Sequence, residues 1–196
     1  MAGIKNALTD ILTKLNTIQV KNAEGQYAAF YTRIFNNQLS QVLDGSGYSW
    51  PRPAAFVEIV SPASFEIIGL GFRSADLGIK IHIIHDFYND EGNFEQDLVI
   101  FDLRDQVIMA LSQFCPTACG PLNCISEYQD YNHGNLYHYV CEFFANLTDS
   151  KGSKYDPDAG NFDESIVDNL DLSTVKSDTG GETPGPTSDY IIPQTH

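Results

Sequence analysis

The stretch from Gly78 to Phe114 constrains the fold more than any other part of this chain. Its beginning, residues 78–86, has isoleucines at alternate positions, as a β-strand with one buried face does. A polar loop rich in Asn, Asp and Gly follows, and residues 94–114 then repeat apolar side chains at helical spacing. The pattern predicts a strand, a turn and a helix of about five turns.

The predicted helix carries more apolar surface than one buried face requires. One stripe at helical spacing consists of Ile100, Leu103, Val107, Ala110, Leu111 and Phe114. A second apolar group lies on another side of the helix and consists of Leu98, Phe101 and Ile108. Because a sheet covers one stripe, the second group is predicted to be a contact with another subunit.

Other segments show the periodicities of one more long helix and of several strands. Residues 3–18 are predicted to form an amphipathic helix and residues 36–43 a short one. Strands are expected over 26–35, 54–60, 65–72, 125–131 and 136–147, with a polar turn at 73–76. The expected class is α+β, with a mixed or mainly antiparallel sheet packed by the N-terminal helix and the long central helix.

The composition changes near residue 149 and divides the chain in two. Residues 1–149 have the patterns of a folded domain, whereas residues 151–196 carry three Lys against seven Asp and two Glu. Such a segment buries too little apolar surface to offset the entropy of ordering, so 150–196 are predicted to be an extended acidic tail. Its apolar patches at 166–175 and 190–193 are candidates for docking on a neighbour.

Charge and hydropathy narrow the choice of partners and compartment. The chain has 196 residues, of which 42% are apolar, and a formal net charge of −15. That charge argues against direct nucleic acid binding and against an anionic membrane surface. The N-terminus has no apolar run typical of a secretory signal, and no stretch reaches the ~18 apolar residues of a membrane helix. We expect a protein made in the cytoplasm.

Two groups of residues are candidates for chemistry, and neither is convincing. The spacing of Cys115, Cys119 and Cys124 lacks the tight pair of a typical zinc site, so reduced thiols are favoured over zinc. His82, His85 and Asp86 have residue types that bind metals or act as general bases. On a strand, however, the two histidines point to opposite faces. We expect no metal, no cofactor and no catalytic residue.

Several short motifs, together with this order of elements, carry a family resemblance. They are Ile34-Phe-Asn-Asn-Gln38, Pro53-Ala-Ala-Phe-Val-Glu58, Ile81-His-Ile-Ile-His-Asp86 and Asp130-Tyr-Asn-His133. With them, residues 1–149 resemble the tail-terminator, or tail-completion, proteins of tailed bacteriophages. The resemblance implies an α+β fold and a homo-oligomeric ring, a hexamer or dodecamer, at the neck of the virion. It implies contacts with other neck, tail or connector proteins and no catalytic residues.

Two other functions remain open from the sequence. The chain could be a head-tail connector adaptor instead of a terminator, and only its position in the virion separates these two roles. It could also be a small soluble enzyme or ligand-binding domain that uses His82, His85 and Asp86. The extension over 150–196 departs from a minimal terminator and could reach an adjacent ring.

Overall fold

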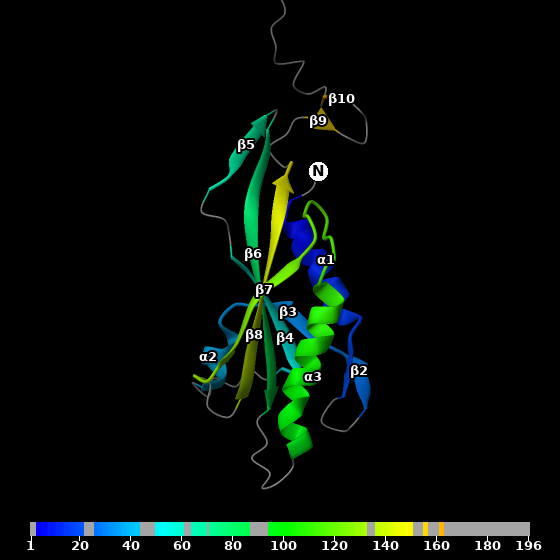
Figure 1. Ribbon diagram of the computed structural model, residues 1–196, viewed down its shortest axis with the longest axis vertical. Coiled ribbons are helices and arrows are strands. Elements are labelled where there is room, and N and C mark those ends of the chain that lie inside the picture. Colours follow the sequence, from blue (N-terminus) through cyan, green and yellow to red (C-terminus); the bar gives the residue numbers. More distant parts are fainter. Residues whose placement is uncertain are drawn as a thin grey trace, which may run out of the picture.

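The computed structural model describes most of the first 150 residues and two short segments beyond them (Figure 1). The described residues are 3–21, 26–43, 50–60, 64–69, 71–86, 94–132, 136–150, 155–156 and 161–162. They form helices and strands with most of the strands in one sheet, so the expected α+β class is confirmed. Most of the acidic extension, including both of its apolar patches, lies outside the described residues.

A six-stranded mixed sheet forms the centre of the molecule. Its main path runs in the order β3 (Tyr31–Ile34), β4 (Ala54–Val60), β6 (Phe72–Asp86), β8 (Leu136–Asp149) and β7 (Asn123–Asp130), and β5 (Glu66–Gly69) also pairs with β6. Strands β3 and β4 run parallel, and the other pairs of this sheet are antiparallel. Two small antiparallel pairs are separate from it, β1 (Gln19–Lys21) with β2 (Tyr27–Ala29) and β9 (Tyr155–Asp156) with β10 (Asn161–Phe162).

The two longest strands, β6 and β8, pair along almost their whole length and form the spine of the sheet. The pairing extends from Arg73 opposite Asp149 to Asp86 opposite Leu136. At one end, the Arg73 guanidinium donates two hydrogen bonds to Oδ2 of the buried Asp149, at 2.9 and 2.7 Å. Antiparallel pairing of this length gives the molecule its elongated sheet (Figure 1).

The polar turn predicted at 73–76 is wrong, because those residues belong to β6. The chain reverses earlier, where Gly69 and Gly71 have positive φ angles of 125° and 81°. Glycine adopts such angles without the steric cost that a Cβ atom would bring. Residues 73–76 are polar because several of their side chains face solvent and because Arg73 pairs with β8, not because the chain turns there.

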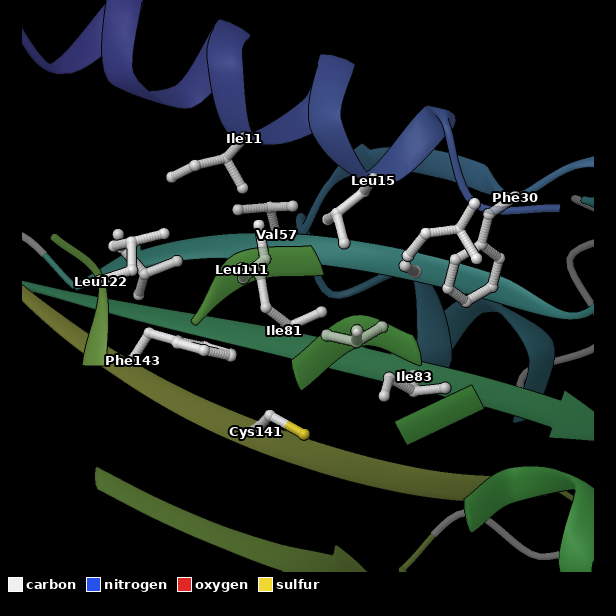
Figure 2. Packing of buried hydrophobic residues seen from close by; sticks show 14 of the residues in the cluster. Ile11, Leu15, Phe30, Val57, Ile81, Ile83, Leu111, Leu122, Cys141 and Phe143 are labelled. Carbon is white, nitrogen blue, oxygen red and sulfur yellow. The ribbon is translucent and has the colours of Figure 1, made fainter. Parts of the chain in front are cut away.

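Helices α1 (Ile4–Asn16) and α3 (Phe94–Leu111) cover one face of the sheet (Figure 1). Figure 2 shows Ile11 and Leu15 of α1 pointing toward Val57 and Ile81 of the sheet. The apolar stripe predicted for α3 supplies Ile100, Leu103, Val107 and Leu111 to this main core. No helix among the described residues is both long and apolar enough to cross a membrane.

The opposite face of the sheet carries a smaller core beside helix α2 (Gln38–Leu43). Its buried members are Leu39, Trp50, Ala54, Phe56 and Ile84. Strand alternation explains the division, because odd-numbered isoleucines of β6 join the main core and Ile84 joins this one. Both faces of the central strands are therefore covered near their lower half in Figure 1.

The single strand predicted over 26–35 is wrong, because the chain breaks at Phe30 and forms two strands. Strand β2 pairs with β1, whereas β3 joins the main sheet. The Phe30 side chain is fully buried in the main core, and its N–H donates to the carbonyl of Ile18 at 2.9 Å. Residues 26–35 are rich in good β-formers, but β-propensity does not show that the two halves of the run pair with different strands.

Candidate functional site

The residues predicted to contact another subunit lie along α3, and they differ in exposure. Leu98 and Phe101 are 40% and 43% exposed, whereas Ile108 is half-buried and packs against the main core. The ring of Phe101 meets the ring of Tyr139 edge-on, with centroids 5.9 Å apart. Met109, which the sequence analysis did not select, is 82% exposed on the same helix. Among the side chains of α3 that the structure describes, the exposed apolar ones are therefore Leu98, Phe101 and Met109.

An ion pair links α3 to the edge strand β7. Arg104 of α3 donates from Nε to Oε2 of Glu127 at 2.7 Å and also from Nη2 to Oε1. This hydrogen bonding raises the pKa of Arg104, so the guanidinium stays charged. Because both groups are partly exposed, the pair contributes little to the stability of the fold.

The structure separates the three residues considered for catalysis. His82 packs with the smaller core, where its ring stacks on Phe35, whereas His85 is on the opposite side of β6 by strand alternation. Asp86 forms an ion pair with Arg52 at 2.8 Å. Within the described residues, no three His, Cys, Asp or Glu side chains are grouped to hold a metal ion, and the four cysteines are free.

His82 belongs instead to a chain of four polar side chains drawn from four strands. Its Nε2 lies 3.1 Å from Oε2 of Glu58, and its Nδ1 lies 2.9 Å from Nε2 of His138. The other nitrogen of His138, Nδ1, lies 3.3 Å from Oδ2 of Asp130. Both imidazoles are buried, and Phe35 covers the ring of His82 at a centroid distance of 4.0 Å. We call this arrangement the histidine chain.

Counting hydrogens limits the protonation states that suit the histidine chain. Its two hydrogen bonds need two N–H groups if Glu58 is ionised, and the contact between His138 and Asp130 is an ion pair only when His138 is protonated. Two neutral imidazoles supply two N–H groups, and one imidazolium with one neutral ring supplies three. Two imidazolium rings would place hydrogens on both nitrogens of the His82–His138 contact and break it. The chain therefore accommodates one extra proton but not two.

Burial makes His82 resist that proton. Desolvation lowers the pKa of His82, and the nearby Glu58 opposes this effect without cancelling it. Burial also lowers the pKa of His85 on the other face. A histidine pair between two carboxylates can store and release a proton, but a reaction also needs an open space for a substrate. Both imidazoles are nearly closed off from solvent, with exposures of 6% for His82 and 3% for His138.

An open hollow of about 720 Å³ lies along the edge strand β3, and Phe35, whose ring covers His82, is part of its lining. It is lined by Tyr31, Arg33, Ile34, Phe35, Asn36, Gln38 and Phe56. Arg33 lies over the Tyr31 ring at 5.0 Å, and no carboxylate of the described residues is within ion-pair distance of it. We call this feature the β3 hollow. It offers apolar walls and one cation.

The free edge of β3 is closed to a further strand by its own side chains. Arg33 donates from Nη1 to the carbonyl of Thr32 at 3.2 Å, and Gln38 donates from Nε2 to the carbonyl of Ile34 at 2.6 Å. Edge strands in soluble proteins are commonly protected against pairing with other chains. The β3 hollow is therefore suited to side chains of a partner and not to an added strand.

Comparison with known proteins adds no family to this description. No model of a known protein family matches the chain, and no curated protein is significantly similar to it. The function must therefore be argued from the exposed surfaces and the resemblance of the motifs.

Proposed function

We propose that the chain is a structural subunit of a tailed-bacteriophage virion and forms a homo-oligomeric ring at the head-tail junction. The ring would act in tail termination or completion and contact other neck or tail proteins. Residues 1–149 would supply the ring, with the N-terminal and long central helices packed on the sheet. Residues 150–196 would extend from it as an acidic tail. The chain would have no catalytic role, no cofactor and no membrane partner.

The observation that carries this proposal is the apolar surface left open on α3. Leu98 and Phe101 are two-fifths exposed although the helix already places a full stripe in the core. Arg104 of the same helix pairs with Glu127 of the edge strand β7. Exposed apolar groups gathered on one element commonly mark an interface between proteins. A head-to-tail contact of this kind closes into a ring when its rotation permits.

Replacing Phe101 by aspartate is expected to leave the subunit folded and to block its assembly. The side chain is partly exposed, so a charge there can remain hydrated in the monomer but must be desolvated in an interface. The measurement is incorporation of the variant into tails or virions, with thermal unfolding of the free protein as the test of folding. Assembly must be measured on particles, because such a subunit can stay monomeric at ordinary protein concentrations until it meets the tail.

Thr13→Asp is the matched control, because it adds the same charge to the exposed side of α1. Ile108→Asp should reduce stability itself, since Ile108 packs against the main core. Unfolding of the Phe101→Asp subunit would show that Phe101 is core. Normal incorporation of that variant into particles would remove α3 from the interface.

Imaging purified particles separates the terminator from the head-tail adaptor. The two roles differ in the ring's position, at the head-proximal end of the tail or against the connector. Density for this chain at either place supports a neck ring and selects one role. Absence of the chain from mature virions would refute the proposed function.

A further inference from the structure

An apolar protrusion lies at one end of the sheet, where β5 pairs with the start of β6 (Figure 1). Ile67 and Ile68 are 81% and 61% exposed, which is unusual for two adjacent isoleucines. The register shifts between Ile67 and Gly69, so Ile68 is an extra residue without a partner on β6. A bulge of this kind bends a strand and redirects its side chains. The sequence therefore builds a projecting apolar end here.

A carboxylate precedes the two isoleucines. Glu66 is exposed and forms no ion pair within the described residues. We call Glu66, Ile67 and Ile68 the β5 tip. It presents two aliphatic side chains with one negative charge, whereas the β3 hollow presents aromatic and aliphatic walls with the positive charge of Arg33. Both surfaces are apolar, and their charges are opposite.

The β5 tip cannot reach the β3 hollow of its own chain. Ile67 pairs with Arg73 of β6, whereas Ile34 of the hollow lines up, through Val57 of β4, with Ile81. The offset between Arg73 and Ile81 along an extended strand is roughly 26 Å. Any contact between the two surfaces must therefore join different copies of the chain.

We propose that the β5 tip of one copy docks in the β3 hollow of the next copy. Ile67 and Ile68 contact the apolar walls around Tyr31 and Phe35, and Glu66 pairs with Arg33. The contact is heterologous, because it joins two different surfaces, so repeated contacts form a ring or an open chain. The inference rests on the proposed ring assembly and adds a second contact to the one on α3.

Charge reversal tests the pairing directly in the full-length chain. Arg33→Glu alone and Glu66→Arg alone each bring like charges together, and each is expected to raise the dissociation constant of self-association about tenfold or more. The double variant restores an opposite pair. An equimolar mixture of the two single variants does the same, because each hollow then finds a tip of opposite charge. Both samples should regain self-association.

Sedimentation velocity of the free protein, up to about 1 mM so that weak contacts are populated, measures the dissociation constant. Ile67→Asp tests the apolar part of the contact and should weaken self-association as well. Ile125→Asp is its matched control, since Ile125 is also an exposed isoleucine but lies on β7. Unchanged thermal unfolding of each variant confirms that it is folded.

A covalent probe detects the contact even when it is short-lived. Arg33→Lys keeps the charge and supplies an amine that a carbodiimide joins to the Glu66 carboxylate. In a mixture of isotopically labelled and unlabelled protein, the inferred contact predicts a crosslink between differently labelled chains. Absence of that crosslink, equal self-association in all charge variants, or a wild-type chain that stays monomeric throughout this range would each overturn the inference.

These experiments distinguish failure of the inferred contact from failure of the proposed function. Suppose that virions contain the chain, that Phe101→Asp removes it, and that the charge variants behave as wild type. The proposed ring would then stand, and the contact between the β5 tip and the β3 hollow would be excluded. Restored self-association in the variant mixture, with the chain absent from virions, would retain the contact but exclude the phage role.

Discussion

Replacing Phe143 by alanine is expected to lower the free energy of unfolding by about 3–5 kcal/mol. The ring is buried in the main core, on the face of the sheet that the two long helices cover, and Figure 2 shows it beside the strands. Its removal loses the transfer free energy of the ring and leaves a cavity that the paired strands on both sides cannot close. Domains of this size have total stabilities of about 5–15 kcal/mol, so the loss is a large part of the whole. Urea unfolding should show a lower midpoint with an unchanged slope.

Phe144→Ala is the matched control for this prediction. Phe144 is the next residue of β8, so it points to the other face of the sheet, and it is only half-buried. Its loss should cost clearly less than the loss of Phe143. Equal losses would mean that the helix-covered face is not the main source of stability.

The elements with strong periodicity could be predicted from the sequence, because the spacing of apolar residues shows which side of a strand or helix is buried. Alternation placed the isoleucines of β6 on the core face, and helical spacing placed Val107 and Leu111 of α3 in the same core. The strand over 54–60 also agrees in its bounds with β4. Where the sequence analysis failed, at Phe30 and at 73–76, the outcome depended on which distant segment each residue paired with.

The histidine chain shows the same limit at the site. Alternation correctly separated His82 from His85, but it could not supply the partners that His82 does have. His138 is 56 residues away along the chain, and Asp130 reaches it only because β7 pairs with β8 in one register. The register between long strands depends on the hydrophobic pattern along their whole length. One short motif is therefore not enough to predict which residues face His82.

The surplus stripe of α3 was also only partly predictable. Helical spacing identified apolar residues beyond the main stripe, but not where the helix axis lies over the sheet. In the folded chain Arg104 of α3 pairs with Glu127 of β7, Phe101 lies against Tyr139, and Ile108 is half-buried on the main core. Leu98 stays open, together with Met109. Of the three residues predicted for the interface, Leu98 and Phe101 are therefore more accessible than Ile108.

The free energy of unfolding is expected to fall as the pH falls below about 6.5, the ordinary pKa of histidine. Burial holds the pKa of His82 below that value in the folded protein. Between the two pKa values, the unfolded chain binds more protons than the folded chain, so protons favour unfolding. Each such histidine contributes a slope of at most about 1.4 kcal/mol per pH unit. His85, whose pKa burial also lowers, acts in the same direction.

Charges around His82 modify this slope and must be controlled. Glu58 and Asp130 favour the imidazolium, whereas Lys80, which pairs with Glu142 at 2.9 Å, disfavours it. Acid also relaxes the repulsion within a chain whose net charge is −15, which opposes the histidine effect. Comparing each variant with the wild type at every pH cancels this general contribution.

His82→Gln removes one titrating group and is expected to flatten the fall in stability between pH 6.5 and the lower pKa. The measurement is the urea midpoint at a series of pH values. His85→Gln should flatten it independently, because His85 lies on the opposite face of β6. The effects of His82→Gln and His138→Gln should not add, since the two rings share one hydrogen bond. An unchanged slope in His82→Gln would mean that His82 titrates in its ordinary range, and additivity with His138→Gln would mean that the rings act separately.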